Sequence, residues 1–203
     1  MLPEQGTPEW RQMRCGWLGA SQVHLAIART KSGWSASREN VMAQLIVERM
    51  TGIPTEGFSS SAMEWGAATE PQARAAYAFS RDVDVQECSF IRHPTINGTG
   101  ASPDGLVDKG GIEIKCPNTA THIDTLLNGT IDGKYRTQML WQMACAGLEW
   151  VDFISFDPRL PGLEMWVMRV ERDDAAIKLL EEQVTEFLLE LEKRMKKLEE
   201  LRA

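Results

Sequence analysis

Apolar residues recur every three or four positions along the C-terminal end of the chain. After Arg172 they are Ile177, Leu180, Val184, Phe187, Leu191, Met195 and Leu198. This spacing places them on one face of a helix, with charged residues on the other faces. It predicts one long helix from Arg172 to the C-terminus, whose more polar second half protrudes, pairs with another subunit or frays.

Start and stop signals predict further helices upstream. Thr7 and Pro8 are typical of a helix start, and Gly16 is typical of its end. A second short helix begins at Ser21. The remaining helices are predicted over residues 37–51, 63–79, 119–129 and 135–146. Pro71 lies inside one of them, so it either kinks that helix or divides it in two.

Alternating apolar and polar positions predict the strands. Residues 84–93 are expected to form one strand, and residues 102–115 a β-hairpin that turns through Lys109, Gly110 and Gly111. Residues 150–156 and 163–170 are expected to form a second hairpin. This order of elements favours an α/β fold with a central mixed sheet flanked by helices.

Length and composition favour one domain over residues 1–203. The chain has 203 residues, of which 43% are hydrophobic, enough for one well-buried core. We expect a cytosolic protein, because no apolar run approaches the length of a membrane span and the N-terminal residues lack a signal-peptide pattern. The four cysteines and three histidines show neither disulfide nor zinc spacing.

The charge balance limits how the protein can contact nucleic acid. A net charge of -7 argues against a protein that coats DNA or RNA by bulk electrostatics, since such proteins carry a basic footprint. A local grip on DNA is still compatible with it. Residues 1–60 are the least acidic part of the chain, so we expect a DNA-binding surface to begin there.

The hairpin at residues 102–115 carries the strongest chemical signal. Side chains alternate along a strand, so Glu113 and Lys115 share one face, and pairing brings Asp104 to the same end. Two close carboxylates attract a hard cation such as Mg²⁺ or Mn²⁺, and a lysine beside it can position the attacking water. The pattern is the signature of the PD-(D/E)xK nucleases. The alternative is an ordinary solvated hairpin face.

Other candidate residues have weaker signals of their own. Arg14 and Ser21 flank one turn and could form a phosphate site, although Arg14 could equally be part of a surface salt bridge. Lys31 lies in a polar loop that also contains the aromatic residue Trp34. Such a loop could contact DNA, or it could be an ordinary exposed loop. Glu70 precedes the helix proline, and Gln138 suits a site wall; each could instead be an ordinary solvated residue.

Several separated stretches resemble the phage λ exonuclease family of viral recombination nucleases. They are WRQMRCGWLGASQVH, the segment AxxWGxxxE that ends at Glu70, SPDG, ExKCP, YRTQ and FDPR. They occur in one order between Trp10 and about Glu171. The resemblance implies a restriction-endonuclease-like core.

The resemblance also implies roles for the catalytic residues. Asp104 and Glu113 would bind Mg²⁺, for which Mn²⁺ would substitute, with help from the Ile114 carbonyl. Lys115 would position the nucleophilic water, and Glu70 would hold a water on the metal.

Further implied roles concern the DNA. Gln138 would line the active site, and a pocket for the 5′-phosphate would consist of Arg14, Ser21 and Ser102. Lys31 stands where the family has an arginine that pulls on the unwinding strand, so the charge is kept but the bidentate fork is lost. Met63 stands at an apolar wedge that splits the terminal base pair, matching in residue type only.

The family implies a ring-shaped homotrimer threaded by double-stranded DNA. It would degrade one strand 5′ to 3′ and leave a 3′ overhang for a partner single-strand annealing protein, in the cytosol of a bacterial host. Two other hypotheses remain: an endonuclease or repair nuclease of the same superfamily, and a catalytically inactive DNA-end-binding subunit.

Overall fold

The computed structural model describes residues 2–55 and 60–202. Its helices are α1 (Pro8–Met13), α2 (Ala20–Ala26), α3 (Ala36–Thr51), α4 (Ser61–Arg81), α5 (Thr119–Asn128), α6 (Gly133–Ala146) and α7 (Asp174–Glu200). Every helix expected from the sequence is present, with ends shifted by a few residues. In the described part of the chain, each helix is too short or too polar to cross a membrane.

The strands form a central sheet, a small sheet and a separate hairpin. They are β1 (Leu18–Gly19), β2 (Arg29–Thr30), β3 (Gly33–Trp34), β4 (Ile91–Arg92), β5 (Thr99–Ala101), β6 (Gly105–Val107), β7 (Gly110–Lys115), β8 (Trp150–Phe156) and β9 (Met165–Glu171). The central sheet has the order β6-β7-β8-β9, in which β7 and β8 are parallel and the other pairs antiparallel. The predicted mixed sheet is therefore confirmed. The small sheet, β1-β5-β4, was not expected from the sequence.

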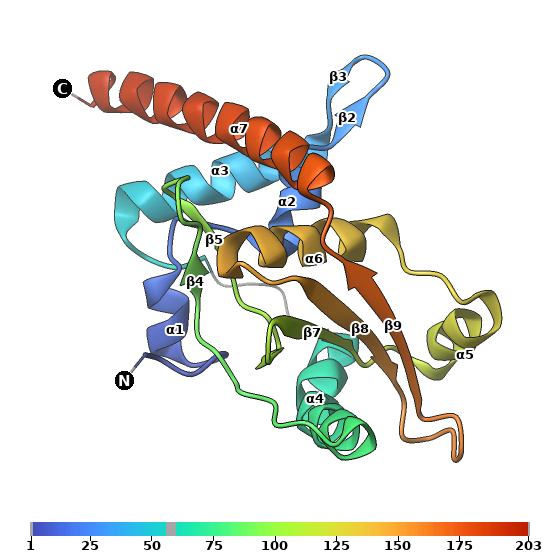
Figure 1. Cartoon of the computed structure of the whole chain (residues 1–203). Helices are drawn as coiled ribbons and strands as arrows, with labels where there is room; N and C mark the ends of the chain where they lie inside the picture. The colour runs from blue at the N-terminus through green and yellow to red at the C-terminus, as the bar shows by residue number, and fades with distance from the viewer. Residues whose placement is uncertain (1, 56–59, 203) are drawn as a thin grey trace.

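Helices α4 and α6 cover opposite faces of the central sheet (Figure 1). Ile112 and Ile114 of β7 pack with Tyr77 of α4, whereas Phe153 of β8 belongs to the cluster around α6. Glu113 pairs in register with Phe153, so its side chain also points to the α6 face. The alternation predicted for this strand is confirmed, and it separates its isoleucines from its charged residues.

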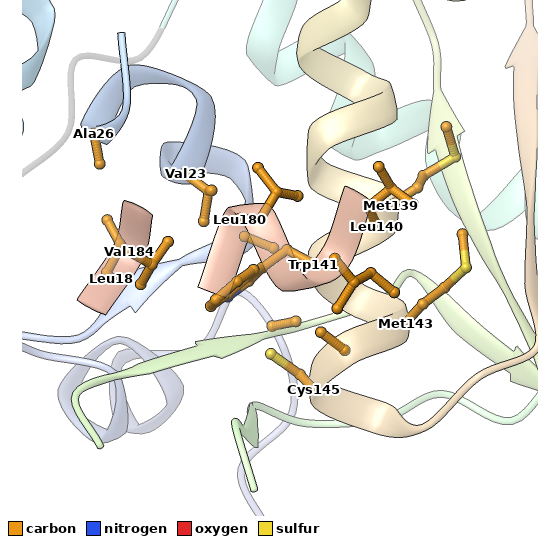
Figure 2. Packing of buried hydrophobic residues seen from close by; sticks show 14 of the residues in the cluster. Leu18, Val23, Ala26, Met139, Leu140, Trp141, Met143, Cys145, Leu180 and Val184 are labelled. Carbon is orange, nitrogen blue, oxygen red and sulfur yellow. The ribbon is translucent and has the colours of Figure 1, made fainter. Parts of the chain in front are cut away.

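The larger hydrophobic cluster lies where α2, α6 and α7 meet, and Figure 2 shows its packing. Trp141 of α6 is completely buried at its centre, and its indole N–H donates to the Thr99 hydroxyl of β5 at 3.1 Å. Val23 of α2 and Leu180 of α7 pack in the same cluster. Because α6 contacts both this cluster and the sheet, its orientation relative to β7 is fixed from two sides.

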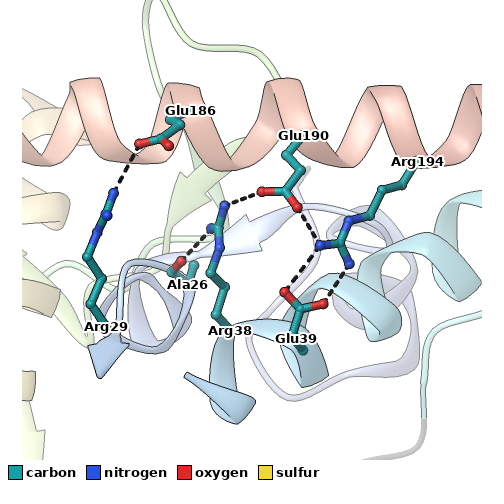
Figure 3. A network of polar contacts seen from close by, with 7 residues as sticks. All are labelled: Ala26, Arg29, Arg38, Glu39, Glu186, Glu190 and Arg194. Carbon is teal, nitrogen blue, oxygen red and sulfur yellow. Dashed lines mark hydrogen bonds and ion pairs between the residues drawn. The ribbon is translucent and has the colours of Figure 1, made fainter. Parts of the chain in front are cut away.

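Charged residues attach α7 to the N-terminal helices (Figure 3). The Arg38 side chain is 1% exposed and donates to the Ala26 carbonyl at 2.7 Å and to Glu190 at 2.6 Å. Arg194 contacts both Glu190 and Glu39. A buried guanidinium is tolerated only when it is paired, so these contacts fix the position of α7 along α3.

The prediction of a single strand over residues 84–93 is wrong. Only Ile91 and Arg92 form a strand, β4, and Gln86 makes an isolated bridge to Leu106. Between these two points the Cys88 carbonyl accepts a hydrogen bond from the side chain of Gln5, at 2.9 Å. The backbone here is thus satisfied by the N-terminal segment rather than by a continuous ladder.

The irregular loop expected around Lys31 is instead a hairpin, β2–β3, which projects from the body beside α7 (Figure 1). Gly33 has a φ of 141°, a conformation that favours glycine and allows the tight return. The Arg29 guanidinium lies 3.7 Å from the centre of the Trp34 ring across the two strands, which adds a cation–π contact.

Two further details differ from the sequence prediction. The β6–β7 hairpin turns at Asp108 and Lys109, with Asp108 at a φ of 50°, so Gly110 and Gly111 belong to the strand. Helix α4 continues through Pro71 as one element, so the predicted division into two helices does not occur. Burial of Tyr77 on the far side of the proline favours continuation of the helix.

Candidate active site

The hairpin backbone positions Asp104. Gly105 pairs with Ile112, and the Asp104 N–H donates to the Ile112 carbonyl at 3.1 Å. The Asp104 carboxylate then reaches across to accept a hydrogen bond from the Ile114 N–H at 2.6 Å. A carboxylate bonded to the next strand cannot swing away from it, so Asp104 is held beside the residues that flank Ile114.

Glu113 and Lys115 form an ion pair on the α6 face of β7. The Glu113 side chain is completely buried, and the Lys115 side chain is mostly buried. Burial alone lowers the pKa of the Lys115 amine, but the carboxylates of Glu113 and Asp104 outweigh it and raise that pKa above its ordinary value. The amine is therefore charged at neutral pH in this metal-free structure. Because both side chains are largely buried, this face of the hairpin is not an ordinary solvated face.

Three carboxyl groups share this weakly solvated region. Burial raises the pKa of Asp104 well above its ordinary value, and the neighbouring Glu113 raises it further. Burial also raises the pKa of Glu70, while Arg74 and Lys115 oppose the shift. Carboxylates that repel one another in a place of low dielectric bind a cation favourably.

Arg74 connects Glu70 to the hairpin. Its guanidinium donates to the Glu70 carboxylate at 2.6 Å and to the Asp104 carbonyl at 3.0 Å. Glu70 also lines a groove of about 400 Å³, whose other walls include Met63, Lys115 and Tyr135. The structure therefore brings Glu70 and Met63 to the acidic hairpin, and it adds Arg74, which the sequence analysis did not identify.

Helix α6 closes the site from the other side with two glutamines. The Gln138 amide donates to one oxygen of Glu113 at 2.7 Å, and the Gln142 amide donates to the other oxygen at 2.5 Å. Gln142 was not identified as a site residue, although its spacing of four from Gln138 places both on one helix face. The missing information was which face of α6 covers β7.

A small second pocket, of about 70 Å³, lies next to this cluster. Its lining includes Arg14, Ser21, Ser102 and Gln138, so all three residues predicted to bind the 5′-phosphate meet there. Gln138 belongs to both places, because it lines the pocket and bonds to Glu113. The pocket is therefore directly adjacent to the acidic cluster.

Arg14 is available for an anion in this pocket. Its guanidinium lies 4.3 Å from the centre of the Trp10 ring, and burial lowers its pKa while Glu48 raises it. Among residues 2–55 and 60–202, no carboxylate lies within ion-pair distance of Arg14. The Ser102 hydroxyl and the Trp10 indole N–H are also buried, and neither has a hydrogen-bond partner within the described part of the chain. A salt-bridge role for Arg14 is thus not observed.

Lys31 lies away from these residues. It is exposed at the turn of the β2–β3 hairpin and lines neither the groove nor the small pocket. Met63 is 60% exposed on the first turn of α4, at the groove wall. The structure thus separates the two residues proposed to act on the duplex, one at the groove and one on the projecting hairpin.

The donor atoms fit a hard divalent cation. In the described ranges, no three His, Cys, Asp or Glu side chains converge as a ready metal cage. The available donors are the carboxylates of Asp104 and Glu113 and the Ile114 carbonyl, which are all oxygen atoms. Mg²⁺ and Mn²⁺ accept few carboxylates and keep several waters, so this sparse oxygen set suits them.

The mixed sheet, its helical layers and the Asp-Glu-Lys hairpin define a restriction-endonuclease-like nuclease fold. Residues 9–149 match the profile of the YqaJ-like viral recombinase domain. The chain belongs to this family, which is the λ exonuclease family anticipated from the sequence. Among curated proteins, none matches the chain significantly.

Solved structures agree with this assignment. One is the crystal structure of LHK-Exo, an alkaline exonuclease from Laribacter hongkongensis, in complex with dAMP. Its sequence is 47% identical to this chain, and the two structures superpose with a TM-score of 0.90. The match covers 97% of this chain and 98% of that chain. A second LHK-Exo structure is 46% identical, with the same coverage and TM-score. A phage-related exonuclease from Haemophilus somnus 129PT shares the fold, with a TM-score of 0.73 at 14% identity over 90% of this chain and 96% of that chain.

Proposed function

We propose that this protein is a Mg²⁺-dependent exonuclease that degrades one strand of double-stranded DNA from its 5′ end. The product would be a duplex with a 3′ single-stranded overhang, suited to recombination by strand annealing. Membership of the viral recombinase family and 47% identity to an alkaline exonuclease support the nuclease class.

One observation carries the proposal: Gln138 joins the acidic cluster to the Arg14 pocket. In this proposal Arg14, Ser21 and Ser102 hold the phosphate at the end of one DNA strand. The next part of that strand would then lie beside Glu113 and Lys115. The first phosphodiester then lies over the catalytic residues. A pocket for the terminal phosphate would account for a requirement for a DNA end, and the 5′ polarity of the proposal follows if the phosphate bound there is a 5′-phosphate.

The reaction in this proposal is hydrolysis of a phosphodiester by water. A divalent cation held by Asp104, Glu113 and the Ile114 carbonyl would lower the pKa of the water and stabilise charge on the phosphoryl oxygens. Lys115, which is ion-paired with Glu113, would position the attacking water beside the phosphate. Glu70, which lines the groove, would hold a water on the metal.

The remaining assignments complete the proposal. Met63 would insert at the terminal base pair, and Lys31 would contact the duplex from the β2–β3 hairpin. The domain would span residues 1–203 and assemble as a ring-shaped homotrimer around DNA, in the cytosol of a bacterial host, with a single-strand annealing protein as partner. In such a ring an acidic exterior is compatible with a locally basic channel.

The deciding experiment compares linear duplexes labelled at the 5′ or the 3′ end, in Mg²⁺ or in a chelator. We expect early release of the 5′ label only, only with metal, and none from the Asp104→Ala variant. Early release of the 3′ label would contradict the polarity. Cleavage of a covalently closed circle would favour the endonuclease hypothesis, and unchanged activity of Asp104→Ala would overturn the site.

A further inference from the structure

Glu113 is held by two amides that come from the same helix. Its side chain is completely buried, and its oxygens accept from Gln138 at 2.7 Å and from Gln142 at 2.5 Å. The oxygen bonded to Gln138 also faces the Lys115 amine. The two carboxylate oxygens therefore differ: one faces the catalytic groups, and the other faces only the interior of the protein.

The two glutamines differ in the same way. Gln138 is partly exposed and lines the Arg14 pocket, so it can contact substrate. Gln142 is 0% exposed and lies between the buried residues Trp141 and Met143 on α6. Substrate cannot reach Gln142, and any effect it has on the reaction must pass through Glu113.

Packing alone does not explain an amide at position 142. Its carbonyl oxygen is buried without a hydrogen-bond partner among the described residues. A buried amide whose oxygen has no partner destabilises a fold, whereas a methionine of similar length would fill the same space. Among the residues that the structure describes, the hydrogen bond to Glu113 is the one that this side chain makes.

We propose that Gln142 is a positioning residue that fixes the inner oxygen of Glu113 and so directs its outer oxygen toward a divalent cation. This inference rests on the proposed nuclease function. A neutral amide suits this task because a lysine or arginine in its place would neutralise Glu113 and compete with the metal. Hydrogen bonds to metal-binding carboxylates commonly change metal affinity in this manner.

The test replaces Gln142 by methionine, which keeps the volume and removes the donor. We expect Mn²⁺ affinity, measured by calorimetry without DNA, to fall about 10-fold to 100-fold. The rate at low metal should fall accordingly and recover as the metal concentration rises. Affinity for a 5′-phosphorylated duplex end in Ca²⁺ should stay the same, because the Arg14 pocket is unchanged.

Gln44→Met is the matched control. Gln44 also donates its amide to a buried glutamate, Glu48, at 2.8 Å, but it lies on α3 outside the candidate site. It should leave Mn²⁺ affinity unchanged. If Gln142→Met does not fold, Gln142→Asn keeps the amide and shortens its reach, and the same loss of Mn²⁺ affinity is expected.

Wild-type Mn²⁺ affinity in a folded Gln142 variant would overturn the inference, as would a lower rate that extra metal does not restore. Failure of the proposed function looks different. In that case neither the wild-type protein nor any variant at position 142 would release nucleotides with Mg²⁺.

Discussion

Asp104 and Glu113 show, at the scale of single residues, a conflict between stability and binding. Both carboxylates lie in a weakly solvated region, and burial and mutual repulsion raise the pKa of Asp104. Lys115 offsets only part of this cost. The folded protein therefore holds charge in an unfavourable arrangement that a divalent cation relieves.

Asp104→Asn should stabilise the metal-free protein and abolish nucleotide release. The asparagine carbonyl can still accept the hydrogen bond from the Ile114 N–H, but the repulsion from Glu113 is removed. We expect a gain of about 1 kcal/mol in the free energy of unfolding, measured by urea denaturation in a chelator. Lower stability than wild type would show that the carboxylate is favourable as it stands.

Arg14→Gln should slow digestion of 5′-phosphorylated ends about 10-fold to 100-fold and affect 5′-hydroxyl ends much less. The reason is loss of a charge-assisted contact in the small pocket. Arg11→Gln, an exposed change on helix α1, which ends just before Arg14, is the control and should match wild type. Equal slowing of both kinds of end would remove Arg14 from phosphate recognition.

Sequence reasoning reached some of these residues and missed others for a physical reason. The period-two alternation was enough to place Glu113 and Lys115 on one face, because it is a local property of the strand. Arg74 and Gln142 act through contacts between elements far apart in the chain. Their roles depend on how α4 and α6 pack on β7, which local patterns do not specify.

At the scale of elements, the same distinction separates correct from incorrect predictions. Helix caps and apolar stripes are local, and the predicted helices are present. The short strands of the small sheet depend on partners distant in sequence: Leu18 pairs with Thr99, and Ile91 with Ala101. Two-residue strands carry too little alternation to be predicted, so residues 84–93 were assigned wrongly.

The junction of β7 and β8 gives a prediction at this scale. A Cβ on Gly110 would lie 2.2 Å from the Trp150 indole, which is rigid and cannot yield easily. Gly110→Ala should therefore destabilise the protein by about 1–3 kcal/mol in urea denaturation. Gly133→Ala, at the start of α6 where nothing lies within 4 Å, should be neutral or slightly stabilising. Equal stability of the two variants would contradict the close approach.

At the scale of the whole molecule, acidity and DNA binding are compatible because charge is distributed unevenly. The net charge is -7, but two acidic residues of α7, Glu190 and Glu192, are paired with Arg38 and Arg49 of α3. The candidate end-binding pocket depends on one guanidinium that no carboxylate neutralises in the described chain. Net charge alone is therefore a poor guide to such a site.

His93 links three parts of the molecule and makes its stability depend on pH. The ring stacks on Trp141 of α6 at 5.1 Å, and its Nδ1 accepts from the Ile96 N–H at 3.1 Å. Its Nε2 lies 3.2 Å from Glu181 of α7. Burial lowers the pKa of His93, and Glu181 opposes this shift only partly.

The folded protein thus binds a proton on His93 less readily than the unfolded chain, in which a histidine binds a proton near pH 6.5. Stability from this residue is present above that pH and is lost as pH falls, by about 1.4 kcal/mol for each unit of pKa difference. His93→Gln should lose less stability than wild type between about pH 7.5 and about pH 5.5 in urea denaturation. Glu181→Gln should lose more, because the group that opposes the shift is removed. If all three proteins show the same change with pH, His93 does not carry this dependence.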